Sequence, residues 1–206
     1  MPTPDQVYIH CDELQNLPPI CRKNWETELD LLTKKLNPNA TVLQVGSMDA
    51  TRIIALLQRR NDLIITGLEI EESLVNLSRS NLAKANLDAT IIHGDITAPP
   101  SLPTFDHVLC LNNTLGYIPD EESAVIHMRK LGETVTISVY GEAFTDELAE
   151  AYFTSLGLNL DHIEGDTIHL KDFSVVRRYS RHTVEQWGGT ITETPLGYYC
   201  EFPGNH

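Results

Sequence analysis

A glycine and an acidic residue in this sequence have the spacing of a nucleoside-binding pair. Gly46 ends the apolar segment 41–46, and Glu69 follows the apolar segment 63–68, 23 positions after that glycine. An acidic residue about 20 positions beyond such a glycine suits a ribose, because one carboxylate can accept both ribose hydroxyls. An acid at the start of the next helix would also be favoured by the helix dipole alone. The strand-end position and the glycine together favour ribose binding.

The residues after Gly46 indicate which nucleotide fits. A dinucleotide site needs several glycines, so that the backbone can approach a pyrophosphate closely. Here Met48 and Ala50 stand where such glycines would be expected, and Asp49 places a negative charge beside any phosphate. S-adenosylmethionine has no phosphate and carries a sulfonium and an ammonium cation. The loop 46–50 therefore favours S-adenosylmethionine over NAD.

These residues are positioned by an alternation of short apolar segments with amphipathic ones. The pattern predicts a helix at about 22–36 and then strands and helices in turn. The expected strands are 41–46, 63–68, 89–93, 105–111 and 134–140, and the expected helices are 49–60, 71–85, 119–130 and 145–156. Such alternation is typical of a parallel sheet with helices on both faces. Ligands bind such sheets beyond the carboxyl ends of the strands, where Gly46 and Glu69 lie.

The end of the chain has a different pattern. Extended segments are expected near 159–170 and 173–179, then a short helix at 181–187 and a last strand near 196–202. Glu164-Gly165-Asp166 predicts a tight turn between two strands. We therefore predict an α/β, doubly wound, mostly parallel seven-stranded sheet with one antiparallel strand near the edge. The chain is expected to form a single domain over 1–206, in which residues 1–36 are an N-terminal arm and helix.

Four segments resemble, in order, the motifs of the class I S-adenosylmethionine-dependent methyltransferases. They are VLQVGSMDA, LEIEESLVNLSRSNL, HGDI and FDHVLCLNNTLGYIPD, and the similarity runs from about residue 41 to residue 140. The resemblance implies a Rossmann-like methyltransferase fold with S-adenosylmethionine as cofactor.

The same resemblance assigns cofactor-binding residues to three loops. It implies that the first loop, with Gly46, Ser47 and Met48, wraps the methionine part of the cofactor. Glu69, with Ile70 beside it, would hold the ribose. The position of Asp95 implies a bond to the adenine amino group, with Ile96 beside the adenine ring.

Leu111 to Tyr117 is the most specific single segment. It resembles the loop after the fourth strand of small-molecule methyltransferases, which is rich in Asn and Thr or Ser. The resemblance implies that Leu111 and Asn112 contact the cofactor and that Asn112, Asn113 and Tyr117 orient a polar acceptor as catalytic residues. An ordinary polar turn after a buried strand would also contain asparagines.

The first loop departs from the family at three positions. The family usually has an acid where Gln44 stands and glycines where Met48 and Ala50 stand. Methyl transfer itself needs alignment of the acceptor rather than a dedicated nucleophile, so the absence of a nucleophile motif is no argument against it.

Composition narrows the range of partners. The net charge of −14 disfavours a nucleic-acid partner, because a phosphate backbone must be neutralised by Lys and Arg. None of the eight histidines belongs to a metal-binding motif, so no metal is predicted.

The sequence has no apolar run of the roughly 18 residues that a membrane span needs, and no secretory signal is expected at its start, which favours a cytoplasmic protein. A homo-oligomer stays open.

Three functions remain at this point. The leading one is S-adenosylmethionine-dependent methyl transfer to a small polar acceptor molecule. The second is a catalytically silent, methyltransferase-like subunit that acts through a protein partner, which the altered loop favours. The third is an oxidoreductase on the same scaffold, which the missing glycines disfavour.

Overall fold

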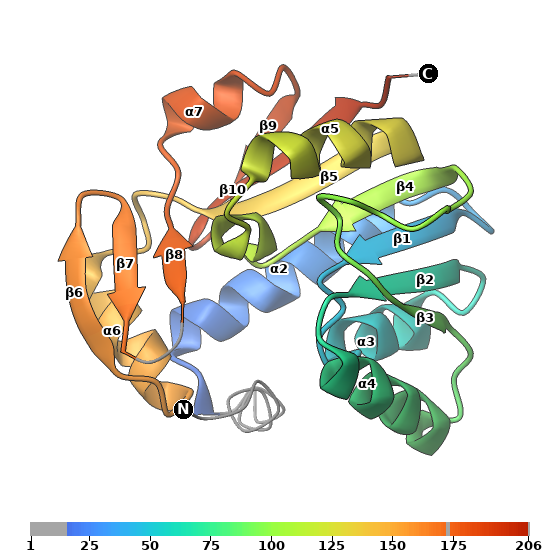
Figure 1. The fold of residues 1–206 in the computed structure, drawn as a ribbon, viewed down its shortest axis with the longest axis horizontal. Coiled ribbons are helices and arrows are strands. Elements are labelled where there is room, and N and C mark those ends of the chain that lie inside the picture. Colours follow the sequence, from blue (N-terminus) through green and yellow to red (C-terminus); the bar gives the residue numbers. More distant parts are fainter. Residues whose placement is uncertain (1–15, 172–173, 206) are drawn as a thin grey trace.

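The computed structural model describes residues 16–171 and 174–205 (Figure 1). Most of the predicted N-terminal arm therefore lies outside the described residues. Within those residues, no helix is both long enough and apolar enough to cross a membrane.

A seven-stranded sheet forms the centre of the molecule, in the strand order β3-β2-β1-β4-β5-β10-β9. Its strands are β1 (Thr41–Val45), β2 (Ile64–Glu69), β3 (Thr90–His93), β4 (Phe105–Cys110), β5 (Gly132–Tyr140), β9 (Thr190–Glu193) and β10 (Gly197–Pro203). The strands β1 to β5 pair with one another in parallel, and β10 is antiparallel to both β5 and β9. The predicted mostly parallel sheet with one reversed strand near its edge is confirmed.

Helices cover both faces of this sheet. They are α2 (Pro19–Lys35), α3 (Thr51–Arg59), α4 (Glu72–Ala85), η2 (Thr114–Tyr117), α5 (Glu121–Leu131), α6 (Asp146–Ser155) and α7 (Arg181–Glu185). Successive strand residues point to opposite faces. In β1, Val42 packs into the cluster with α2, α3 and α4, whereas Leu43 packs into the cluster with α5 and α7. Figure 1 shows α5 in front of β4 and β5, with α2 passing behind the sheet.

A second, three-stranded antiparallel sheet holds the extended segments after residue 159. Its strands are β6 (Leu160–Glu164), β7 (Thr167–Leu170) and β8 (Val175–Arg177). The tight turn expected at Gly165 is present, and that glycine has φ 57°. Ile168 and Val176 are fully buried in a third core cluster with α6 and the end of β5. These segments therefore pack against α6 and the end of β5 and do not join the main sheet. The strand β9, which pairs with β10 in the main sheet, was not predicted.

Candidate functional site

A cavity of about 570 Å³ lies beyond the carboxyl ends of the central strands. The loops after β1, β2, β3 and β4 line one part of it, and α2, α6 and the segments that flank the small sheet line the rest. Ten of the residues expected at the site line this cavity: Gly46, Ser47, Met48, Glu69, Ile70, Asp95, Ile96, Leu111, Asn112 and Tyr117. The sheet thus brings together residues that are up to 71 positions apart in the sequence.

The loop after β1 keeps a glycine-like backbone at positions without glycine. Gly46, Met48 and Ala50 have φ angles of 66°, 50° and 68°. This left-handed region costs glycine little, but it costs other L-residues roughly 1–2 kcal/mol each. Met48 and Ala50 thus adopt, at this cost, backbone conformations that glycine adopts freely.

Side chains from β2 and α4 hold this strained loop. Glu69 Oε2 accepts a hydrogen bond from the Met48 amide at 2.7 Å, and the Ser78 hydroxyl donates to the Met48 carbonyl. Asn81 donates to the carbonyl of Asp49 at 3.0 Å. Because these bonds fix both polar groups of the Met48 backbone, the surrounding structure over-determines its conformation.

Gly46 is required by a close approach as well as by its φ angle. A Cβ atom at this position would lie 2.5 Å from Cγ2 of Thr114, in the loop after β4. Any side chain there would push the loops after β1 and β4 apart. Gly46, the one glycine of the family pattern that this loop keeps, thus allows the loops after β1 and β4 to approach each other at the cavity.

Glu69 is buried, with 4% of its surface exposed. Oε1 accepts from the Glu71 amide at 3.2 Å, in addition to the bond between Oε2 and Met48. Burial raises the pKa of the Glu69 carboxyl, and the backbone amides of Met48 and Glu71 oppose that rise. A carboxylate has about four lone-pair sites, so this one can accept further donors from the cavity. Ile70, 56% exposed, lies next to it.

The loop after β3 contributes Asp95 and Ile96. Oδ1 of Asp95 accepts from the Thr97 amide at 2.8 Å, which folds the loop into a turn around the half-buried carboxylate. Ile96 is 4% exposed and belongs to the core cluster that contains Leu68. An acceptor group and an apolar surface therefore stand side by side in this part of the cavity.

Two adjacent asparagines in the loop after β4 have different surroundings. Asn112 and Asn113 both adopt left-handed backbone conformations, with φ of 51° and 62°, which asparagine tolerates better than most residues. The amide of Asn112 donates to Ser138 Oγ at 2.7 Å. Its side chain lines the cavity and makes no hydrogen bond with the described residues.

Asn113, in contrast, does not line the cavity. It is fully buried, its Oδ1 accepts from the Tyr140 amide at 3.0 Å, and its Nδ2 donates to the Arg177 carbonyl at 3.0 Å. Both side-chain groups are therefore used to join β5 and β8. This placement corrects the expectation that Asn113 contacts an acceptor: its surroundings are those of a residue that positions the loop.

An ion pair that the sequence did not reveal borders the same cavity. Arg52 lines the cavity and is 2.7 Å from Glu28 on α2; the two side chains are 8% and 2% exposed. Its guanidinium lies over the ring of Trp25, 5.4 Å from the ring centre. Arg52 belongs to no motif, and only the packing of α2 on α3 brings it to Glu28.

The cavity also has an apolar end, formed far from the family motifs. Its residues come from α2 and the residues before it, from α6 and from the segment after α6, namely Leu17, Cys21, Tyr152, Leu156 and Leu158. Tyr117 packs against the same core cluster. Burial raises the pKa of the Cys21 thiol to about 11, so this thiol is neutral at pH 7. No sequence pattern pointed to these residues, because they meet only in the folded chain.

Comparisons with known proteins agree with this architecture. A family model described as a methyltransferase domain matches residues 42–131. The PH0226 protein from Pyrococcus horikoshii OT3 is 16% identical, with a TM-score of 0.63 over 87% of this chain and 89% of that one. CalS10 from Micromonospora echinaspora, an amino pentose methyltransferase solved with bound SAM, is 16% identical, with a TM-score of 0.61 over 86% of this chain and 90% of that one.

A third solved structure is that of SibL, an S-adenosylmethionine-dependent methyltransferase in its apo form. It is 19% identical, with a TM-score of 0.61 over 87% of this chain, and the present chain spans 55% of its length. No curated protein matches the sequence. Residues 42–131 thus match a methyltransferase domain, and the chain has the Rossmann-like fold of the class I S-adenosylmethionine-dependent methyltransferases.

Proposed function

We propose that this protein binds S-adenosylmethionine in the 570 Å³ cavity and transfers its methyl group to a small acceptor molecule. The observation that carries the proposal is the meeting of four strand-end loops, with Glu69, Asp95 and Asn112, in one cavity. CalS10, whose fold this chain shares, was solved with bound SAM.

The polar groups of the first loop fit the methionine part of the cofactor. Gln44 Oε1 and Ser47 Oγ are buried without a hydrogen-bond partner among the described residues, and both residues line the cavity. Two unsatisfied acceptors in one place suit an ammonium group, whose three donors would relieve the cost of burying them. Arg52, at the start of α3, supplies positive charge for the carboxylate of the same amino acid group.

The remaining residues fit the nucleoside. The Glu69 carboxylate would accept the ribose hydroxyls while it keeps its bond to Met48. Asp95 would accept from the adenine amino group, and Leu68 and Ile96 would contact the ring on its apolar faces. In this proposal each polar part of the cofactor meets a group of complementary chemistry.

For the transfer itself, the chain's task is to align the acceptor and to exclude water. When bound, S-adenosylmethionine supplies a methyl group already activated by its sulfonium. Transfer to the acceptor's lone pair would convert the bound cofactor to S-adenosylhomocysteine, and the acceptor's proton would be released to solvent with the products. The free amide of Asn112 and the phenol of Tyr117 would orient the acceptor, which is the larger part of such catalysis.

The apolar end of the cavity narrows the class of acceptor. Leu17, Leu156 and Leu158 surround space that a purely polar molecule would fill poorly. We infer an acceptor with a polar, methyl-accepting group held near Asn112 and a small hydrocarbon or aromatic portion that lies against these leucines.

A second function rests on the altered first loop. Met48 lines the cavity. If its side chain fills the space that the methionine part of the cofactor needs, the cofactor cannot bind. The protein would then be a catalytically silent subunit that acts through a protein partner. Such a subunit would form no S-adenosylhomocysteine with any acceptor.

The test measures formation of S-adenosylhomocysteine from S-adenosylmethionine with a panel of small amines and phenols that carry an apolar ring. Asn112→Gly removes the amide but keeps the left-handed backbone, so we expect it to lower turnover by roughly 10- to 100-fold, because misalignment of reacting groups has effects of this size. Asn61→Ala, at an exposed asparagine, is the control. Equal turnover by Asn112→Gly and wild type would remove Asn112 from the mechanism. No turnover with any acceptor, despite cofactor binding, would favour the silent subunit.

A further inference from the structure

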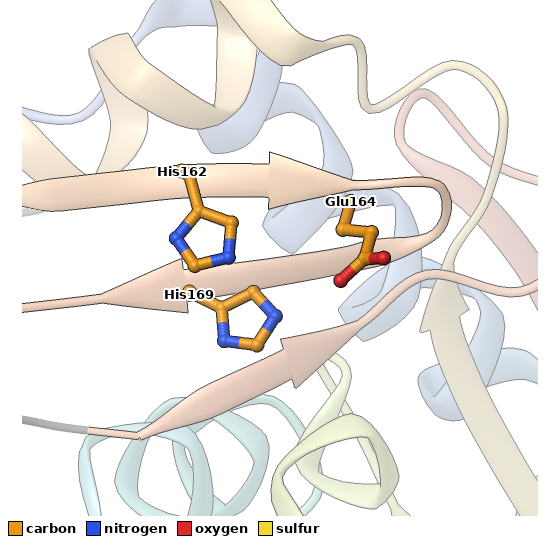
Figure 2. Close-up of side chains that lie close together, drawn as sticks. All are labelled: His162, Glu164 and His169. Atoms are coloured by element: carbon orange, nitrogen blue, oxygen red, sulfur yellow. The ribbon is translucent and has the colours of Figure 1, made fainter.

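Three side chains that can bind a metal ion lie together on the small sheet, away from the cavity (Figure 2). They are His162 and Glu164 on β6 and His169 on β7, and one potential ligand atom from each lies within 4.8 Å of the others. Figure 2 shows the two imidazoles one above the other and the carboxylate of Glu164 beside them. None of the three lines the cavity.

The hairpin itself places these residues together. His162 and Glu164 are two positions apart on one strand, so they point to the same face. His169 pairs directly with His162 across the hairpin, and their rings are stacked with centroids 4.1 Å apart. Ile168 on the other face is fully buried, so a slip in register would expose it. The arrangement is thus fixed by the strand pairing before any ion binds.

A neighbouring carboxylate orients one of the imidazoles. Asp161 Oδ2 lies 2.9 Å from Nδ1 of His162, which leaves Nε2 of that ring for a ligand. Histidines that bind metals almost always use their second nitrogen in this way, and such a partner fixes the ring and its tautomer. The carboxylate also contributes negative charge next to the site.

The donor set indicates the kind of ion. Two imidazoles and one carboxylate suit Zn²⁺ and neighbouring transition metals, whereas Mg²⁺ and Ca²⁺ prefer oxygen ligands alone. Zinc–ligand bonds of about 2.0–2.2 Å require the stacked imidazoles to turn about their side-chain torsions until their ring nitrogens converge, and the potential ligand atoms already lie within 4.8 Å of one another. Three protein ligands leave a fourth position for water.

We propose that His162, Glu164 and His169 bind one divalent transition-metal ion of the zinc class and so cross-link β6 to β7. The three metal-binding side chains take no part in methyl transfer, but the small sheet that carries them contacts the loop after β4. β8 pairs with β7, and the Arg177 carbonyl on β8 accepts a hydrogen bond from Asn113 in the loop after β4. Metal binding would therefore stiffen a sheet that supports the loop after β4.

The test is a titration of the metal-free protein, prepared without a polyhistidine tag, with Zn²⁺ in competition with a chromophoric chelator. We expect one equivalent to bind, and Co²⁺ in its place to give the visible absorption of a tetrahedral site. His162→Ala and His169→Ala should each weaken binding at least tenfold, because each removes one of only three ligands. His182→Ala, at an exposed histidine on α7, should bind the ion as wild type does.

Folding is controlled by circular dichroism and thermal melting of each metal-free variant. If His169→Ala does not fold, His162→Gln decides, because His162 is exposed and its loss leaves the buried face of the hairpin unchanged. The proposal is overturned if wild type binds no Zn²⁺ or Co²⁺ at about millimolar concentration, or if the folded His162 variant binds as tightly as wild type. Neither result would bear on binding of S-adenosylmethionine.

Discussion

At the scale of single residues, the backbone conformation at positions 48 and 50 sets the shape of the loop after β1. A methionine and an alanine there adopt backbone conformations that glycine takes most easily, with φ of 50° and 68°. Glu69, Ser78 and Asn81 hold the polar backbone groups of this loop. The structure thus shows an altered loop in which hydrogen bonds from β2 and α4 maintain the shape that glycines would permit.

The backbone strain at Met48 can be measured with two variants that both lack the long side chain. Met48→Gly should be more stable than Met48→Ala by about 1 kcal/mol or more, because only glycine relieves the left-handed conformation. At the exposed helical position Gln58 the order should be the reverse, with alanine about 1 kcal/mol more stable than glycine. Urea unfolding of the four variants provides both differences. If alanine were more stable than glycine at position 48 as well as at position 58, the backbone at Met48 would be unstrained.

Glu69 should affect stability and binding in opposite directions. Burial raises its pKa, so its contribution to stability is fully present below the unfolded pKa of about 4.5 and is lost as the pH rises through the folded pKa. Glu69→Gln removes the buried charge but has a single acceptor oxygen, so it keeps only one of the two bonds from the Met48 and Glu71 amides. Because the charge is costly only where the acid is ionised, we expect the stability of the variant to be close to that of wild type at pH 7 and below it at pH 4. Its affinity for the nucleoside should fall by roughly tenfold or more.

Urea unfolding at both pH values and titration with S-adenosylhomocysteine test this expectation. Glu69→Ala is the less informative change, because it also removes the acceptor for the Met48 and Glu71 amides. A large loss of stability in Glu69→Gln at pH 7 would mean that the loop requires the negative charge.

At the scale of elements, the contact between α2 and α3 contains a buried ion pair next to the cavity. Glu28 and Arg52 are both nearly inaccessible, and Glu28 also accepts from Asn24 at 3.1 Å. Burying two charges is costly unless they are paired, so the loss of one partner is far worse than the loss of both.

A double-mutant cycle at this pair is expected to be strongly non-additive. Arg52→Met should lower the free energy of unfolding by about 3–5 kcal/mol, because it leaves the Glu28 charge buried and unpaired. Combining it with Glu28→Met should recover most of that loss. Arg59→Ala, which removes the more exposed pairs with Glu26 and Asp30, should cost about 1 kcal/mol or less. Additive effects at Glu28 and Arg52 would mean that the pair is not coupled.

The elements that could be predicted from the sequence are those whose pattern is local. Each of the first five strands is a short apolar run, all but β3 are followed by a helical segment, and the loops after β1 to β4 fell where the motifs placed them. The extended segments after residue 159 and the turn at Gly165 were predicted, but not that they form a separate sheet, because a local pattern indicates a strand and not the sheet that it joins. The strand β9 was not predicted. Arg52 and the apolar wall of Leu17 and Leu158 were missed for the same reason: only the folded chain brings them to the cavity. Asn113 was expected at the site because it belongs to the same motif as Asn112, which does line the cavity.

At the scale of the whole molecule, the cavity lies where three core clusters meet. Leu68 and Ile96 belong to the cluster on one face of the main sheet, Leu111 to the cluster on the opposite face, and Leu158 to the third cluster, which includes α6 and the small sheet. A nucleoside and an acceptor bound side by side would therefore contact separate parts of the core. This arrangement suits a reaction between two small molecules that must be held close together.

The most direct test of this account is calorimetric titration of wild type and Met48→Gly with S-adenosylhomocysteine, with NAD as the comparison. Methionine is flexible, so Met48 can turn aside and leave room for the ligand. We predict that wild type binds one equivalent of S-adenosylhomocysteine, that Met48→Gly changes the affinity only modestly, and that NAD does not bind. Binding by Met48→Gly alone would show that the methionine side chain closes the site. Failure of both proteins to bind would contradict the assignment of this cavity to S-adenosylmethionine.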